Sequence, residues 1–288
     1  MREWVTHSQE ATTMGTFTAV QGRGAARRAA NSSAMDAAAR WGLAARGVIY
    51  CLIGLLALRL AFGGGEQADN GGALRELGRQ PFGAFLIWAI GIGVAGMALW
   101  RLSEALFGAA GPDGHKATKR LSSAGRAVFY GLTSYSMISF AIKDKGSGSS
   151  DKKSQDVTAT ALGWPAGQWL VAIGGLVIAG AGVWIVIQAA RRSFHKHLKH
   201  AQMSQTARKV TDVLGVTGGI ARGVLFTVAG IFAVRAALAY DPNKAKGMDD
   251  TLRTFADTPA GPWLLAAIAI GLVLFGVFSF ALARWRRV

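Results

Sequence analysis

Long apolar runs alternate with short polar segments along this chain. The runs cover residues 44–62, 82–103, 126–142, 166–189, 216–238 and 261–283. About 20 helical residues cross a hydrocarbon layer of about 30 Å, and five of the six runs reach that length. The run at 126–142 is short and rich in hydroxyl side chains. We predict a membrane helix there because a repeat in the sequence requires one.

One two-helix unit occurs three times in the sequence. The first run of each unit opens with an arginine that is followed, four positions on, by an aromatic residue. These pairs are Arg46 and Tyr50, Arg126 and Tyr130, and Arg222 and Phe226. A Pro-x-Gly signature opens the second run of each unit, at Pro81, Pro165 and Pro259. Self-similarity of this kind predicts an internally duplicated fold, and proline is suited to the first turn of a helix.

The predicted fold class is an all-α membrane protein with six transmembrane helices. These helices form three parallel two-helix repeats in a pseudo-threefold arrangement about the membrane normal. The repeats are expected at residues 37–108, 120–194 and 214–288, after a disordered cytoplasmic arm at 1–36. Because each unit has an even number of spans, all units insert the same way up, unlike the inverted repeats of many transporters.

The basic residues predict the orientation. Of the 32 lysines and arginines, 20 lie in residues 1–46, in segments 108–126 and 190–222, and in the C-terminal tail. The loops at 63–80, 143–164 and 241–258 hold 9. An excess of Lys and Arg marks cytoplasmic loops, so both termini are expected in the cytoplasm of a bacterial cell, with the protein in its plasma membrane. The net charge of +16 is explained by cations that flank membrane spans, and no nucleic-acid partner is expected.

Five repeated arginines are the candidate anion- or lipid-binding residues. Arg46, Arg126 and Arg222 are placed at the cytoplasmic start of the odd-numbered spans, and Arg59 and Arg235 follow thirteen residues after the first and third of them. One interpretation is snorkelling, in which the guanidinium reaches into the lipid head groups. The alternative is a ring of cations that binds an anionic head group or substrate, with the deeper pair bound to outer-loop acids.

Other polar positions have structural interpretations. Gly54, Ser134 and Gly230 recur eight residues after the arginines, and small residues allow helix backbones to approach closely in a bilayer. The outer loops are predicted to hold short interfacial helices, with N-caps at Gly72, Asp156 and Asp250. Arg101 and Glu104 are three residues apart, so an ion pair is expected between them.

The sequence offers no recognisable catalytic motif, and no catalytic residue, cofactor or metal is expected. Cys51 is the single cysteine. Three histidines occur at 195, 197 and 200, but the surrounding cations disfavour a metal ion. An enzyme that acts on a lipid-linked substrate through Asp156 or Asp250 is a third hypothesis beside the two given below.

The chain resembles the domain-of-unknown-function family 1206, whose members are bacterial, largely actinobacterial, membrane proteins with three two-helix repeats. The resemblance covers residues 37–288 and depends on the Arg-Gly-x-x-Tyr/Phe openings, the Pro-x-Gly segments and the ending at 275–287. Ala127 replaces glycine in the second opening, and Leu282 stands where an acid is common. The resemblance implies a fold and a location, and it transfers no site.

Two main functions are therefore expected. The first is a non-enzymatic structural or partner-binding component of the cell envelope, in contact with the bilayer, with anionic head groups on the cytoplasmic side and with a membrane protein partner. The second is a small transporter or channel for an anion or lipid that uses arginines at the repeat interface.

Overall fold

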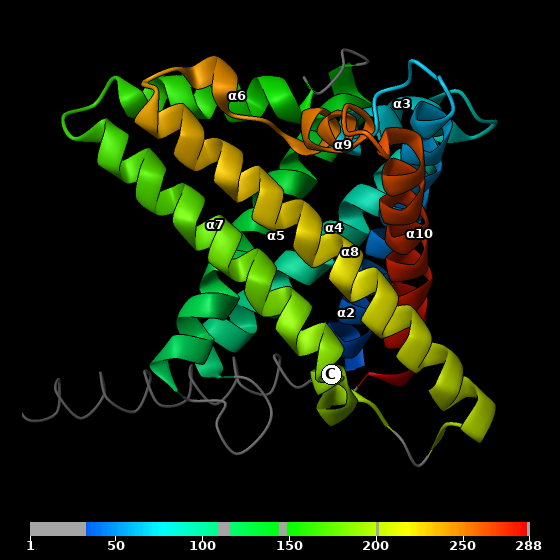
Figure 1. The fold of residues 1–288 in the computed structure, drawn as a ribbon. Helices are drawn as coiled ribbons and strands as arrows, with labels where there is room; N and C mark the ends of the chain where they lie inside the picture. Colours follow the sequence, from blue (N-terminus) through cyan, green and yellow to red (C-terminus); the bar gives the residue numbers. More distant parts are fainter. Residues whose placement is uncertain (1–32, 109–115, 144–148, 200–201, 287–288) are drawn as a thin grey trace, which may run out of the picture.

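The computed structural model describes residues 33–108, 116–143, 149–199 and 202–286. Six long helices dominate this part of the chain (Figure 1). They are α2 (Ser33–Ala61), α4 (Gly83–Phe107), α5 (Ala117–Lys143), α7 (Gly167–Ala190), α8 (Gln205–Leu238) and α10 (Gly261–Trp285). Three short helices, α3 (Asn70–Gly78), α6 (Ser150–Leu162) and α9 (Met248–Ala256), lie together at the end opposite the described chain termini (Figure 1). Two 3₁₀ turns, η1 (Ser193–His197) and η3 (Pro242–Lys244), complete these elements.

Five of the long helices are long and apolar enough to cross a membrane: α2 from Asp36 onward, α4, α7, α8 and α10. They indicate a multi-pass membrane protein. The helix α5 has the length but not the hydropathy, because hydroxyl and charged side chains interrupt it, so the sixth span stays a prediction.

The helices α2 and α8 extend beyond their predicted starts. The described part of α2 begins eleven residues before the apolar run at 44–62, and α8 starts eleven residues before the run at 216–238. The added segments contain Ala, Gln, Arg and Lys, which are good helix formers, so the helix continues beyond the apolar run. Residues 1–32 of the arm predicted to be disordered lie outside the described residues, and α2 already includes 33–36. Arg46 and Arg222 therefore lie well inside their helices.

The long helices pack in one series, from α5 through α4, α2, α10 and α8 to α7. The most extensive contacts join neighbouring repeats: α4 with α5, α7 with α8, and α10 with α2. Within repeats, α2 packs on α4 and α8 on α10, whereas α5 and α7 are not among the packed pairs. In Figure 1, α7 and α8 run alongside each other, and α10 stands beside α2. The last long helix, α10, therefore packs against the first, α2.

Small residues bring neighbouring repeats together at equivalent positions. Ser134 Oγ donates to the Gly91 carbonyl at 2.9 Å across α4 and α5. A Cβ atom at Gly175 would lie 2.9 Å from the Gly230 carbonyl oxygen, and one at Gly54 would lie 2.8 Å from that of Ala269. These three contacts join the tenth residue after each Pro-x-Gly proline to the eighth residue after the repeat arginine. The prediction of close backbone packing at Gly54, Ser134 and Gly230 is confirmed.

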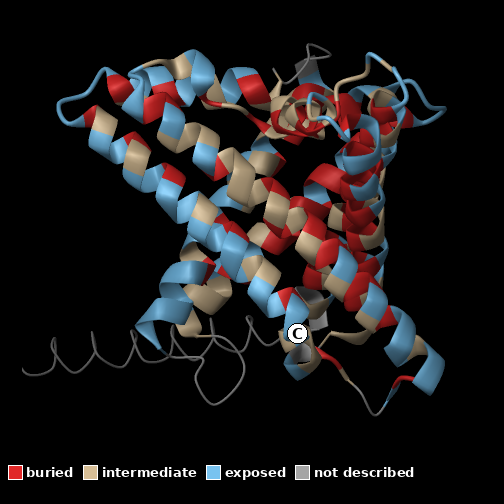
Figure 2. Cartoon of the chain, in the orientation of Figure 1, coloured by how far each residue is buried: buried red, intermediate tan, exposed pale blue. Residues whose placement is uncertain are grey.

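The second repeat lacks the glycine at which the two long helices of each other repeat pack closely. In the first repeat Ala45 of α2 packs against Gly93 of α4, and in the third Ala221 of α8 packs against Gly271 of α10. The corresponding residue of the second repeat is Val177, which is exposed. A Cβ atom at the opposing Gly125 would meet no atom within 4 Å. Because valine occupies the place of a glycine, α7 cannot approach α5 as closely, and Figure 2 shows α7 largely exposed.

The Pro-x-Gly signatures have a different role from the one predicted. The helices α4, α7 and α10 begin at the glycine, two residues after each proline, so these prolines lie before the first turn. A Cβ atom at Gly83 would lie 2.8 Å from the Gly78 carbonyl oxygen, and one at Gly261 would lie 2.7 Å from the Ala256 carbonyl carbon. Glycine is needed where α4, α7 and α10 start against the ends of the short helices α3, α6 and α9.

We predict that Gly230→Leu lowers the free energy of unfolding by about 2 kcal/mol or more, because the new side chain forces α7 away from α8. The measurement is denaturant unfolding of the purified protein in detergent micelles. Gly131→Leu is the matched control, since a Cβ atom there meets no atom within 4 Å. Equal losses in the two variants would contradict the packing account.

Candidate functional site

Two of the repeated arginines turn toward the interior. Arg46 Nε donates to Ser279 Oγ at 3.1 Å, and its guanidinium carbon lies 5.2 Å from the centre of the Phe275 ring. Arg222 Nε donates to the Tyr50 hydroxyl at 2.9 Å, and its guanidinium carbon lies 5.0 Å from the centre of the same Phe275 ring. The two side chains therefore meet over one aromatic ring, an arrangement that stabilises a cation. The snorkelling interpretation expects these side chains to extend away from the protein into the lipid head groups, whereas both contact side chains of other helices.

The contacts of Arg46 and Arg222 also connect the repeats. Arg222 of the third repeat donates to the hydroxyl of Tyr50 of the first, and Tyr130 of the second repeat is an electrostatic neighbour of Arg46. Each arginine thus lies near the aromatic residue that opens another repeat. The register places Phe226, which lacks a hydroxyl, at the third equivalent position.

Two further arginines stack on Trp100. The guanidinium carbons of Arg101 and Arg286 lie 4.2 Å and 4.8 Å from the ring centre. Arg101 is 5% exposed, and its Nη1 atom lies 2.6 Å from an oxygen of Glu104, so the predicted ion pair is confirmed. Ser123 donates to the same oxygen at 3.2 Å. The Nε atoms of Arg101 and Arg286 are buried and have no hydrogen-bond partner.

Arg126 stands at the margin of this group. Its side chain is exposed, and Arg101 and Arg222 are among its electrostatic neighbours. We define the arginine cluster as these five residues: Arg46, Arg101, Arg126, Arg222 and Arg286. Glu104 is the carboxylate that joins them in the described part of the chain, so the cluster has a formal excess of four positive charges.

The charges of the cluster act on one another. Burial, followed by the charges of Arg101 and Arg46, lowers the pKa of Arg286 to about 9. Like charges and low polarity both disfavour the protonated guanidinium. An anion placed between these side chains would relieve both effects.

The structure leaves Arg59 and Arg235 outside the cluster. Both side chains are exposed, near the ends of α2 and α8. Arg59 pairs with Glu66 of the outer loop at 3.8 Å, as one of its interpretations expects. Of the five arginines proposed from the sequence, three belong to the cluster.

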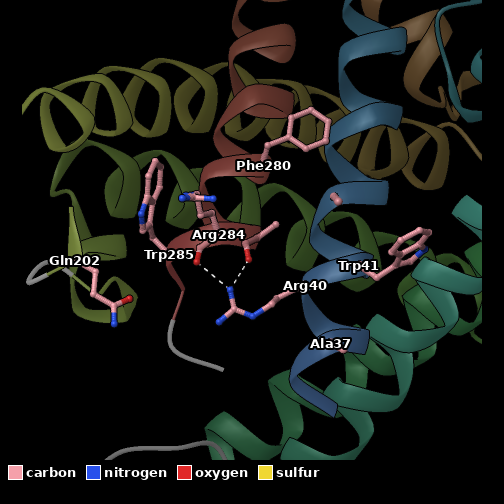
Figure 3. A pocket seen from close by; sticks show the side chains of 9 residues that line it. Ala37, Arg40, Trp41, Gln202, Phe280, Arg284 and Trp285 are labelled. Carbon is pink, nitrogen blue, oxygen red and sulfur yellow. Dashed lines mark hydrogen bonds between the residues drawn. The ribbon is translucent and has the colours of Figure 1, made fainter. Parts of the chain in front are cut away.

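A cavity of about 760 Å³ lies elsewhere, beside α2 and the end of α10. Arg40 and Arg284 both line it. Arg40 Nη1 donates to the carbonyl oxygens of Ala283 and Arg284 at 2.8 Å and 2.9 Å (Figure 3). The cavity wall includes Ala44, which lies about 200° around α2 from Arg46. This cavity is therefore separate from the cluster, and Arg40 completes the C-terminus of α10.

A second group of charged residues joins the three short helices at the opposite end of the molecule. Asp69 Oδ2 accepts the Ser150 N–H at 2.6 Å, Asp151 Oδ1 accepts the Asp250 N–H at 3.0 Å, and Asp249 Oδ1 accepts the Ala68 N–H at 2.7 Å. All three carboxylates are buried. Each repeat therefore offers one carboxylate to a backbone amide of the next, and the three bonds complete a circle.

These acids correct the predicted helix caps. The helices α3, α6 and α9 follow Asp69, Ser149 and Gly247, so the N-caps predicted at Gly72, Asp156 and Asp250 are wrong. A helix starts where a side chain accepts an amide of the first turn. Asp69 accepts from Gly72 N and Ser149 from Lys152 N.

The acids of the outer end also repel one another. Burial, together with the charges of Asp250, Asp249 and Asp69, raises the pKa of Asp151 to about 6. Arg253 donates to Asp249 at 2.8 Å, and this bond raises the pKa of Arg253. Oxygen atoms of Asp151, Asp249 and Asp250 lie within 4.8 Å of one another, but backbone amides already use one oxygen of two of these carboxylates.

His195 has an acid beside it that the sequence interpretation did not foresee. Its Nε2 contacts a carboxylate oxygen of Asp212 on α8. The two residues are 17 positions apart, so spacing gives no sign of the contact.

Comparisons with known proteins agree with this three-part structure. The sequence model of the Domain of Unknown Function family DUF1206 matches residues 41–108, 121–192 and 217–286. The chain belongs to the DUF1206 family. The DUF1206 chain is also 32% identical over 245 residues to the uncharacterized protein YxxB of Bacillus subtilis, covering 83% of this chain and 87% of that protein. No solved structure matches.

The sequence interpretation missed Arg286 as a member of the cluster of this DUF1206 protein. Arg286 lies outside the repeated signatures, in a charged tail. The structure positions it through the β-bridge of Leu198 with Arg286 and through the bond from Lys199 N to Trp285 O at 2.8 Å. The sequence carried no signal for this contact, because only the structure shows that Arg101 and Arg286 share the ring of Trp100.

We predict that Glu104→Ala lowers the free energy of unfolding by about 3 kcal/mol or more, because it leaves Arg101 buried without its counter-charge. Glu76→Ala is the control, since its partner Arg79 is exposed and such pairs contribute about 1 kcal/mol or less. Denaturant unfolding in detergent measures both. Similar effects would show that the Arg101 pair is not energetically distinct.

We predict that the protein loses stability as the pH rises from 3.8 to about 6, the ordinary and folded pKa values of Asp151. In this window the folded state holds a proton that the unfolded state has lost, so the free energy of unfolding falls as pH rises. Asp151→Asn removes this contribution and flattens the profile, whereas Asp156→Asn, at an exposed acid, leaves it unchanged. Unfolding midpoints across this pH range provide the measurement, and identical profiles for wild type and Asp151→Asn would refute the assignment.

Proposed function

We propose that this DUF1206 protein is a non-enzymatic protein of the bacterial plasma membrane that binds an anion in the arginine cluster. The observation that supports the proposal most strongly is the pair of buried, unpartnered Nε atoms of Arg101 and Arg286. Each belongs to a guanidinium that already has an aromatic neighbour, and each still has a donor to offer. A phosphate or carboxylate group is the natural acceptor for guanidinium donors.

The excess of charge favours this function over a purely structural role. Charged residues within a bilayer are costly and are typically found at functional sites. Pairing would lower that cost, yet Glu104 balances one of five arginines. The geometry therefore favours the anion or lipid hypothesis over a structural component of the envelope. Anionic head groups and a membrane protein partner remain the proposed partners.

The proposal includes six spans in three parallel hairpins about a pseudo-threefold axis, with both termini in the cytoplasm. It is supported by the equivalent small-residue contacts at all three repeat junctions and by the length of α5, which at 27 residues reaches about 40 Å. The described termini lie on the same side as the start of α8 and the end of α7 (Figure 1). These helix ends adjoin the basic segment 190–222, in agreement with the positive-inside rule.

We predict that the purified protein binds inorganic phosphate saturably, measured by equilibrium dialysis with radiolabelled phosphate in a nonionic detergent. Arg46→Gln combined with Arg222→Gln should reduce affinity at least tenfold, or about 1.4 kcal/mol, because two donors and two charges are lost. Arg59→Gln combined with Arg235→Gln is the matched control and should bind like wild type, since these arginines lie outside the cluster.

Two results would overturn the anion-binding function: no saturable binding by the wild-type protein, or equal losses in the two double variants. Replacement of Arg46 and Arg222 relieves repulsion between like charges but also removes the hydrogen bonds to Ser279 and Tyr50, so the double variant must also be shown to be folded. Size-exclusion chromatography and thermal unfolding verify this.

A further inference from the structure

We propose that the anion bound in the arginine cluster is the phosphate head group of an anionic phospholipid, which enters sideways from the bilayer between α5 and α7. This inference rests on the anion-binding function proposed above. It adds the class of ligand and the route by which the ligand reaches the cluster.

The second long helix of each repeat, which is α4, α7 or α10, has an equivalent face that points outward. Eleven residues after each Pro-x-Gly proline stand Ile92, Leu176 and Ile270, all exposed. Eighteen residues after it stand Leu99, Val183 and Val277, also exposed. Apolar side chains that are exposed at the same register in all three repeats identify the face that meets lipid tails.

The inward face of α7 differs from its counterparts. Nine residues after the proline, Ile90 and Ile268 are buried in the first and third repeats, whereas the second repeat has Gly174, where a Cβ atom would meet no atom within 4 Å. Sixteen residues after it, Met97 and Phe275 are buried, and the second repeat has Ala181, which is exposed. The second repeat therefore lacks side-chain bulk where the other two fill their interiors.

The facing side of α5 is equally unfilled. Phe129 is 53% exposed, although its counterparts Ile49 and Leu225 are 4% and 2% exposed. A Cβ atom at Gly125 would meet no atom within 4 Å. We define the α5–α7 opening by the residues Gly125, Phe129, Gly174 and Ala181.

The chemistry of the α5–α7 opening selects its occupant. Its walls are apolar, and protein interiors leave little space unfilled, so a bilayer would fill the opening with acyl chains. Arg126 directly follows Gly125 and is exposed at the margin of the cluster, with Arg101 and Arg222 as electrostatic neighbours. A ligand with an apolar tail and a phosphate head group satisfies both regions together. A soluble anion would use the cluster alone.

Charge also selects against a second copy of the chain in this position. Each copy has a net charge of +16, so a second copy would add repulsion next to Arg126. An anionic lipid supplies the negative charge that the cluster lacks.

The test uses full-length protein reconstituted in nanodiscs of equal parts phosphatidylglycerol and phosphatidylcholine, then released in mild detergent for native mass spectrometry. Wild type should retain phosphatidylglycerol in preference to phosphatidylcholine. Gly174→Ile combined with Ala181→Phe gives the second repeat the side chains of the third, Ile268 and Phe275. This filled variant should retain at least tenfold less phosphatidylglycerol, or about 1.4 kcal/mol, while its binding of inorganic phosphate stays unchanged.

Val183→Phe is the matched control, because it adds comparable bulk on the lipid face and should retain phosphatidylglycerol like wild type. Arg126→Gln is a second variant that changes no packing, and it should also reduce phosphatidylglycerol retention. If the filled variant does not fold, Arg126→Gln decides the question.

The outcomes separate the two proposals. Unchanged phosphatidylglycerol retention in the filled variant and in Arg126→Gln, with phosphate binding intact, would overturn the lipid route and leave the anion-binding function in place. Equal retention of the two lipids by wild type, or a mass of two chains without bound phospholipid, would also overturn the lipid route. Absence of phosphate binding by wild type would overturn the anion-binding function itself.

Discussion

The structure depends on the close approach of helix backbones between neighbouring repeats. At each of the three junctions a small residue of one repeat meets a small residue of the next: Gly91 with Ser134, Gly175 with Gly230, and Ala269 with Gly54. Lipid tails are as apolar as leucine, so packing of this kind, and not the hydrophobic effect, joins helices in a bilayer. The contacts fix the rotation of each helix about its axis. That rotation turns Arg46 and Arg222 toward the same ring of Phe275.

Much of the fold could be predicted from the sequence, because hydrophobic length and repetition are properties of the chain itself. The small-residue contacts and the Arg101–Glu104 pair followed from spacing along single helices. The start of α8 at Gln205 and the extension of α2 before residue 44 did not, since a polar helix that continues beyond an apolar run leaves no mark in hydropathy. Likewise, helix caps depend on which side chain reaches an amide, and Asp69 does so while Asp156 does not.

The candidate site was predicted in part. Repetition identified Arg46, Arg126 and Arg222, but their direction depends on helix rotation, which a single sequence does not give. Arg286 joins them through a bridge to Leu198, a contact between segments 88 residues apart in the chain. The open second repeat had a sequence signal, because Val177 and Gly174 break the pattern set by Gly93 and Ile90. That signal has meaning only after the inward and outward positions are known.

The pairing of α10 with α2 has a consequence for biosynthesis. Arg40 of α2 donates to Ala283 and Arg284, 243 and 244 residues later in the chain. Translation proceeds from the N-terminus, and domains generally fold in that order. The first hairpin therefore enters the membrane with the small-residue face of α2 uncovered, and it waits for the last helix to be synthesised. A truncation that removes α10 therefore also removes the packing partner of α2, at the other end of the chain.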